Sequence, residues 1–300
     1  MFLGFFTVKK KDAESLASEI FKKLEEDNLD IANCRGQAYD NAAVMAGEKG
    51  GVQKKIMAKI EQAYFVNCEN HSLNLACLHA SEVEPVVVTF FGTLDRLYAF
   101  FSASTSRWDA LKKHVTVAVK RQCDTRWSAR HDAVKALSDG FDSVIACLEY
   151  LQSNDESTRD TKADAGSLLQ ALQQFTFLVF LKYWHVLLTS INRVTKRLQR
   201  PEADLCSATE DLRSLTAILS NKNTQTIDAA ISETTEYCNE NDIDMKRRTR
   251  RRKRMPGEDA QDVGLTMEGE CRRVMTAIYD RLLKEISERT SRIEELRKRF

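Results

Sequence analysis

CRGQAYDNAAVMAGEKGGVQKKI, residues 34–56, is the stretch that decides how this chain is expected to fold. A single carboxylate, Asp40, follows Tyr39 and precedes a run of small residues. Two interpretations are open from these letters alone. Asp40 and Asn41 are common turn residues, because both side chains can hydrogen-bond nearby backbone groups. Alternatively, Asp40 is a metal ligand at the end of a strand, where small neighbours allow substrate to approach closely.

The segments around this stretch predict a layered α/β arrangement. The apolar run at 2–8 predicts a covered strand, and residues 10–30 carry apolar side chains at helical spacing. A short strand near 31–37 would then deliver Asp40 at its carboxyl end. Further elements expected before residue 81 are a helix over 42–62 broken near Gly50 and Gly51, a strand over 63–66 and a helix over 71–80.

The rest of the chain is expected to be mainly helical. Only three prolines and eleven glycines occur in 300 residues, which argues against a many-turned β protein. Apolar spacing predicts a helix over 85–102, residues 115–121 are either a strand or an extended arm, and helical stripes follow residue 128. The polar segment 239–265 predicts a disordered loop, and one or two charged helices are expected over 270–300.

Composition and cysteine usage narrow the class of protein. The length allows one large domain or two ordinary ones, and 43% hydrophobic residues are enough for a core. Eight cysteines occur without a CxxC pair, and there is no secretory signal or apolar run long enough to span a bilayer. The cysteines are therefore expected to be reduced intracellular thiols, mostly small core residues.

Cys68 and His71 have the residue types of metal ligands, but no second such pair lies nearby. We favour packing and hydrogen bonding at a strand–helix junction over a structural zinc site. A thiol–imidazole nucleophile is disfavoured as well, because no orienting acid is evident. The glycine-rich motifs that hold phosphates are absent from the sequence.

One segment concentrates positive charge in a chain whose net charge is only +1. As a solvated loop it needs no partner, whereas as a binding element it suits nuclear import or nucleic-acid phosphates. We favour the nuclear interpretation. The basic run consists of Lys246, Arg247, Arg248, Arg250, Arg251, Arg252, Lys253 and Arg254.

Arg126 and Trp127 stand at an expected helix start. In one interpretation Asp124 or Thr125 caps the helix and Trp127 lies in the core. In the other, Trp127 is an aromatic platform for a base and Arg126 contacts phosphate.

Three motifs in this order, residues 34–56, YFVNCENHSLNLA at 64–76 and CDTRWSARHDAV at 123–134, resemble the hAT (hobo–Activator) superfamily of DNA transposases. The resemblance extends over nearly the whole chain. It implies a fold class of α/β plus α: an incomplete ribonuclease-H-like catalytic domain over 1–105, then a mostly helical insertion domain over 106–300 with a disordered basic loop at about 239–265.

The resemblance also implies roles for the candidate residues. The family's active site is two Asp and one Glu that hold two Mg²⁺ ions, and Asp40 matches the second Asp. Cys68 and His71 match the family's CxxH motif, and Arg126 and Trp127 match an arginine–tryptophan signature that contacts the DNA end. The family usually has glycine at the positions of Ala38 and Asn41 and asparagine at that of Val44.

The first Asp, the final Glu, the dimerisation region and the zinc-finger module of the family are expected outside residues 1–300. We therefore expect a catalytically inactive transposase fragment or domesticated relic that holds no Mg²⁺ or other cofactor by itself. DNA and nuclear proteins are the expected partners, the nucleus is the expected location, and no membrane is involved. Two alternatives stay open: a helical protein-interaction module, and an active Mg-dependent transposase whose ends were lost in annotation.

Overall fold

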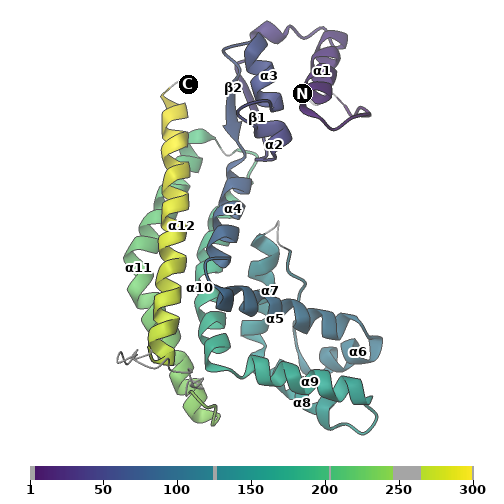
Figure 1. Ribbon diagram of the computed structural model, residues 1–300, viewed down its shortest axis with the longest axis vertical. Coiled ribbons are helices and arrows are strands. Elements are labelled where there is room, and N and C mark those ends of the chain that lie inside the picture. The colour runs from purple at the N-terminus through teal and green to yellow at the C-terminus, as the bar shows by residue number, and fades with distance from the viewer. Residues whose placement is uncertain (1–3, 124–126, 203, 246–264, 299–300) are drawn as a thin grey trace, which may run out of the picture.

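The computed structural model describes residues 4–123, 127–202, 204–245 and 265–298. Two levels are visible in Figure 1: a small unit with two strands lies at one end, and an elongated body of helices lies below it. The elements are α1 (Ala13–Glu26), the 3-10 turn η1 (Ile31–Asn33), β1 (Gly36–Tyr39), α2 (Ala43–Ala46), α3 (Val52–Lys59), β2 (Tyr64–Asn67), α4 (Glu69–Ser81), α5 (Pro85–Ser102), α6 (Thr105–His114), α7 (Trp127–Asp139), α8 (Phe141–Ser153), α9 (Arg159–Leu172), α10 (Phe175–Leu198), α11 (Leu205–Glu240) and α12 (Met267–Arg297).

The two strands of the N-terminal unit pair in parallel, with Gly36 opposite Tyr64 and Tyr39 opposite Asn67. Parallel pairing requires a crossover between the strands, and α2 and α3 provide it. The Gln37 amide is buried and donates to the backbone oxygens of Gln53, at 3.0 Å, and Ala63, at 2.9 Å. One side chain therefore ties β1 to the crossover helix and to the residue before β2.

Two expectations for the N-terminal unit were wrong in detail. Residues 4–8 form no strand, and the Phe5 side chain is 96% exposed because neither β1 nor β2 pairs with this segment. The strand expected near 31–37 begins only at Gly36, since Asp30 caps a 3-10 turn that occupies the preceding residues. Of the two alternatives for residues 115–121, the strand is absent, and the segment is an irregular arm that follows α6.

The break expected in the helix over 42–62 is confirmed at Gly47 and Gly51. A Cβ added to Gly51 would lie 2.5 Å from the Gly47 nitrogen. The backbones of these two residues therefore approach more closely than a residue with a Cβ at position 51 would allow. Val52, which begins α3, is fully buried. The turn thus sets the direction in which α3 packs under α1.

Aromatic side chains fill the middle of the helical body. Phe91 of α5 lies edge-on to Trp184 of α10 and Trp127 of α7, with ring centroids 5.1 and 6.0 Å apart. Trp184 is fully buried, and Trp127 is 2% exposed. Four of the eight cysteines, all of which are free thiols, are also buried in this body.

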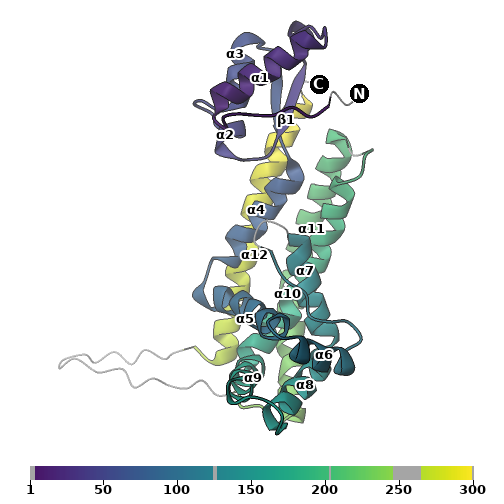
Figure 2. The same ribbon diagram turned by 90° about the vertical axis from the view of Figure 1, so that its right-hand side faces the viewer.

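The long helices α11 and α12 complete the body, and α12 returns along α4 toward the strands. In Figures 1 and 2 the end of α12 lies beside the N-terminal unit. The helix expected at 270–300 is therefore a single one. Of the loop expected over 239–265, residues 239 and 240 belong to α11, and 246–264 lie outside the described residues.

Buried apolar residues form two clusters, one within residues 17–63 and a larger one from Leu73 to Ile293. Helices α4 and α5 belong to the larger cluster. The division of the chain at residue 105 stays a prediction.

In the part of the chain that the structure describes, no single helix is long and apolar enough to cross a membrane. The bent pair α4 and α5, which meet at 110°, passes on length and composition together.

Candidate functional site at the strand ends

Asp40 lies where the sequence predicted it, directly after β1. Its Oδ1 accepts a hydrogen bond from the backbone N–H of Ala42 at 3.1 Å, which is the turn chemistry of the first interpretation. The next side chain, Asn41, donates from Nδ2 to the Ser72 hydroxyl at 3.2 Å and so ties the turn to α4. Asp40 therefore both serves the turn and lies at the end of a strand.

Cys68 connects β2 to α4 at the same edge. Its backbone N–H donates to the carbonyl of Tyr39 at 2.9 Å, and its own carbonyl accepts from Ser72 at 2.9 Å. The Cys68 side chain is exposed, and His71 is half-buried on the first turn of α4. Among the described residues, no group of three or more His, Cys, Asp or Glu side chains could hold a metal ion. The CxxH motif lies at a strand–helix junction, where the backbone of Cys68 joins β1 to α4.

A cavity of about 450 Å³ opens beside this junction, between the strand ends and the last turns of α12. We call it the strand-end cavity. It is lined by Asn41, Ala46, Glu48, Gln53, Phe65, Asn67, Glu69, Ser72, Arg289, Arg292, Glu295 and Leu296.

Glu69 is the most perturbed ionisable group in the strand-end cavity. Burial raises the pKa of its carboxyl to about 7, although the charges of Arg292 and Arg289 pull the pKa down. Its Oε2 is buried and has no hydrogen-bond partner in the structure, and the same holds for Nε of Arg289 and Oδ1 of Asn41. The three residues line the strand-end cavity, while these three atoms are themselves buried without internal partners.

Sequence reasoning missed Glu69, Arg289 and Arg292. Glu69 stands inside the Cys68-x-x-His71 motif, so attention to the residues between the two named positions was the available signal. Nothing in the sequence placed α12 beside β2, because this proximity depends on the path of the whole helical body.

Trp127 begins α7 in the core, as in the first of its two interpretations. Its ring is 5.9 Å from that of Trp184, and the Arg130 guanidinium lies 4.8 Å from its centroid. With 2% exposure the ring offers no face to a nucleic-acid base in this conformation. Contact with DNA by Trp127 stays a prediction, and Arg126 lies outside the described residues.

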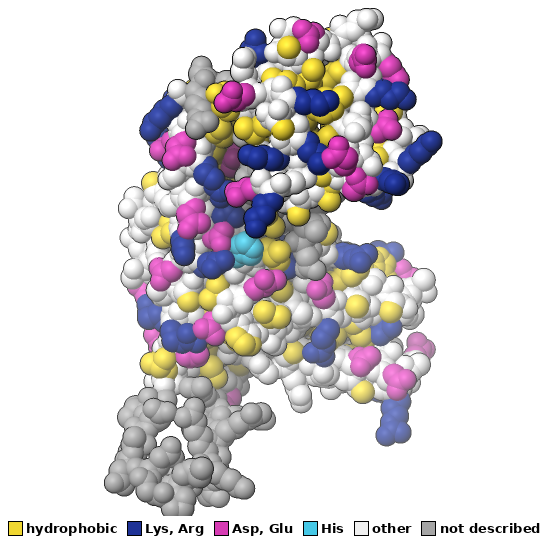
Figure 3. Space-filling view, turned by 45° about the horizontal axis from the view of Figure 1, so that its top comes forward, with side chains coloured by type: hydrophobic (Ala, Val, Ile, Leu, Met, Phe, Trp, Pro, Cys, Tyr) yellow, Lys and Arg dark blue, Asp and Glu magenta, His cyan; other side chains and the backbone are white. Residues whose placement is uncertain are grey.

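The basic run at 246–254 also lies outside the described residues. On the face drawn in Figure 3, Lys and Arg side chains are interspersed with Asp and Glu over the N-terminal unit. This face therefore carries no broad patch of one charge.

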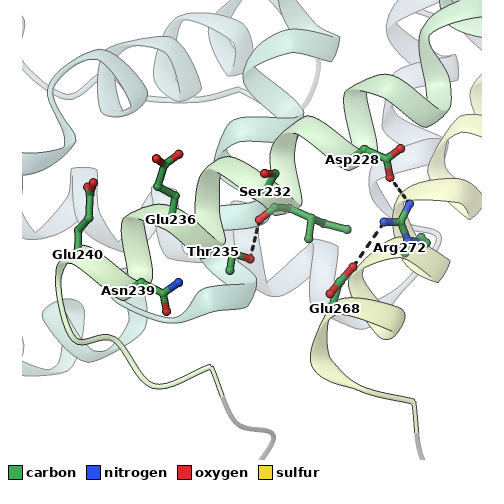
Figure 4. Close-up of a pocket in the computed structure, with 9 residues that line it drawn as sticks. Asp228, Ser232, Thr235, Glu236, Asn239, Glu240, Glu268 and Arg272 are labelled. Atoms are coloured by element: carbon green, nitrogen blue, oxygen red, sulfur yellow. Dashed lines mark hydrogen bonds and ion pairs between the residues drawn. The ribbon is translucent and has the colours of Figure 1, made fainter.

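A second cavity, of about 690 Å³, lies between α11 and α12 (Figure 4). Arg272 is held there by Asp228 at 2.5 Å and Glu268 at 3.5 Å. Asp228, Glu236, Glu240 and Glu268 make its lining predominantly acidic. Arg272 is the one cation among the lining residues of this cavity, and it is already paired with carboxylates. The lining therefore offers no evident group for binding or catalysis.

Comparisons with known proteins bear on these observations. Residues 1–51 match the family described as ZMYM1/FAM200, RNase-like domain. The 52 kDa repressor of the inhibitor of the protein kinase from Mus musculus is 28% identical over 236 residues, as is its counterpart from Homo sapiens. The alignment covers 74% of this chain but only 30% of either relative. No solved structure matches. The resemblance to transposase-derived proteins is thereby confirmed.

Proposed function

We propose that this chain is part of a hAT-transposase-derived protein that binds nucleic acid in the nucleus and does not itself cut or join DNA. The observation that carries the proposal is the position of Asp40 at the carboxyl end of a parallel strand, directly beside the CxxH junction. The family's second catalytic Asp is expected at such a strand end. The match of residues 1–51 to an RNase-like domain supports the same assignment.

In this proposal, residues 1–105 derive from a ribonuclease-H-like domain and 106–300 from its helical insertion. Asp40 is a vestige of the metal site, because its Oδ1 serves a backbone turn and the nearest cavity is lined by only three carboxylates together with two arginines. Mg²⁺ would be a cofactor of a complete family member, in which further carboxylates join Asp40.

The basic run at 246–254 is the element proposed to contact nucleic acid. Eight positive charges in nine residues suit phosphates, and each phosphate contact makes the affinity depend more steeply on salt. The relatives are named as repressors, which fits a regulatory protein in the nucleus.

Fluorescence anisotropy with a labelled DNA duplex tests this assignment. We expect replacement of the eight basic residues by glutamine to weaken binding by about tenfold or more and to flatten the salt dependence. Replacement of the exposed Lys9, Lys10 and Lys11 is the control and should leave the affinity within about twofold of the parent. Equal affinities of the parent and the glutamine variant would refute nucleic-acid binding through this run.

A helical protein-interaction module is the second candidate, and the continuous core from Leu73 to Ile293 favours it. This body has a core of its own and could present a surface to a nuclear protein. If the parent chain binds no DNA but retains a nuclear protein that the glutamine variant also retains, the second candidate replaces the first.

A further inference from the structure

We propose that the strand-end cavity binds a single unpaired nucleotide, with its base beside Phe65 and its phosphate beside Arg292. The inference goes beyond the proposed function, because it uses none of the residues in the basic run. It rests on the size of the cavity, on an aromatic ring and side-chain amides among its lining residues, and on an arginine of α12 that lines it.

The cavity has the dimensions and walls of a small-molecule site. Its volume of about 450 Å³ falls within the range in which proteins hold molecules of nucleotide size. One wall comes from the turn after β1, from β2 and from α4, and the opposite wall is the end of α12. Ala46 and Leu296 add apolar surface to a lining that is otherwise rich in hydrogen-bonding groups.

Phe65 and Asn67 give the cavity a face suited to a base. They are two residues apart on β2 and therefore point to the same side of the sheet. The Tyr39 ring is stacked near Phe65 at a centroid distance of 6.0 Å and an angle of 22°, which restricts the orientation of the Phe65 ring. An aromatic ring that stacks on a base contributes binding energy whatever the base is.

Amide groups among the lining residues can read a base. Asn41 is held by its hydrogen bond to Ser72, while its Oδ1 is buried and has no partner. Asn67 also lines the cavity. Asparagine amides pair with the donors and acceptors on base edges, and a carboxylate such as Glu69 accepts from the amino group of cytosine.

The charges indicate a nucleotide in preference to a bare anion. Arg292 lines the cavity with no hydrogen bond or ion pair to any described side chain, so its guanidinium is available for phosphate. Glu48, Glu69 and Glu295 oppose an anion that brings no hydrogen-bond donors. A ligand with a phosphate at one end and an amino-bearing base at the other satisfies both sets of groups.

Isothermal titration calorimetry of the full chain tests the inference, with dCMP, dTMP, cytidine and inorganic phosphate as the probes. We expect dCMP to bind about tenfold more tightly than cytidine or phosphate alone, because each of those lacks one half of the ligand. We expect dTMP to bind more weakly than dCMP, since thymine has no exocyclic amino group to donate to Glu69.

Two variants and one control test the assignment of residues. R292Q should weaken dCMP binding by about tenfold, and E69Q should bring dCMP and dTMP within about twofold of each other. R297Q changes the same residue type further along α12, outside the cavity lining, and should bind dCMP as the parent does. Thermal unfolding of each variant verifies that it is folded.

The absence of dCMP binding at concentrations up to about 5 mM would overturn the inference, as would R292Q binding as tightly as R297Q. The glutamine variant of the basic run separates this inference from the proposed function. If it loses duplex binding but keeps dCMP binding, both hold; if it loses dCMP binding, the cavity is not the site. Displacement of dCMP by a short cytosine-containing single strand would assign the cavity to strand nucleotides, and lack of displacement would assign it to free ones.

Discussion

Nδ1 of His79 on α4 lies 3.0 Å from Oε1 of Glu285 on α12, across 206 positions of sequence. Glu285 is 8% exposed and also pairs with Arg289 and Arg281 on its own helix. This cluster fastens α12 along α4 and thereby holds one wall of the strand-end cavity in place.

Removal of the Glu285 carboxylate should be costly. E285A leaves the Arg289 guanidinium, itself 8% exposed, without its anionic partner, and we expect a loss of about 3 kcal/mol in the free energy of unfolding. E288A on the exposed side of α12 is the matched control and should change the free energy by less than about 0.5 kcal/mol. Urea unfolding measures both free energies. If E285A lost no more than the E288A control, the cluster would contribute no stability.

Glu69 predicts a dependence of stability on pH. Its pKa is about 7 in the folded chain against an ordinary value of 4.5, so over this range the folded chain keeps a proton that the unfolded chain has lost. The free energy of unfolding should therefore fall as the pH rises from 4.5 to 7. E69Q should remove this decline and stabilise the chain by about 2 kcal/mol at pH 8, after allowance for partial solvent contact.

Denaturant unfolding at several pH values measures this dependence. E295Q changes another carboxylate that lines the same cavity and should retain the decline of the parent chain. If the parent and E69Q have parallel profiles, Glu69 is not held protonated in the folded chain.

The two glycines before α3 allow a test of the close backbone approach between Gly47 and Gly51. A Cβ at Gly51 would meet backbone atoms of Gly47 and Met45 at 2.5 to 2.9 Å, whereas a Cβ at Gly50 meets nothing within 4 Å. We expect G51A to cost about 2 kcal/mol because backbone must move, and G50A to be neutral or slightly stabilising. Thermal unfolding of the two variants decides this, and equal midpoints would contradict the described turn.

Trp127 can be tested as a core residue. W127A should lower the free energy of unfolding by about 4 kcal/mol, because the ring is fully enclosed by Phe91, Trp184 and Arg130. W108A removes the same side chain from a half-buried position on α6 and should cost clearly less. A W127A chain as stable as W108A, but with weaker DNA binding, would instead support the aromatic-platform interpretation.

Local signals allowed the sequence to predict much of the fold. The helix predicted over 85–102 has those bounds in the structure, because Pro85 starts it and the apolar spacing of Phe90, Leu94 and Leu97 matches a buried face. The position of Asp40 after a strand followed from the strand–helix pattern, which placed a short strand just before it. Of the strand expected at 2–8, the described residues 4–8 form none, because apolar composition does not specify a pairing partner.

The sequence predicted the part of the candidate site that lies at the strand ends, but not the part that α12 contributes. Asp40, Cys68 and His71 lie within 32 residues of sequence and were recognised together as motifs. Arg289 and Arg292 line the strand-end cavity next to this junction from more than 200 positions away, and their place there depends on the packing of α12 against α4. Sequence spacing contains no signal for such a contact.

The central claim is that the chain binds nucleic acid without processing it. Incubation of supercoiled plasmid with the full chain and Mg²⁺ or Mn²⁺, followed by gel electrophoresis, tests this claim most directly, with a D40N variant run alongside. We predict slower migration of plasmid that stays supercoiled after the protein is removed, for parent and D40N alike. Accumulation of nicked or linear plasmid with the parent but not with D40N would show that Asp40 is catalytic and would contradict the account.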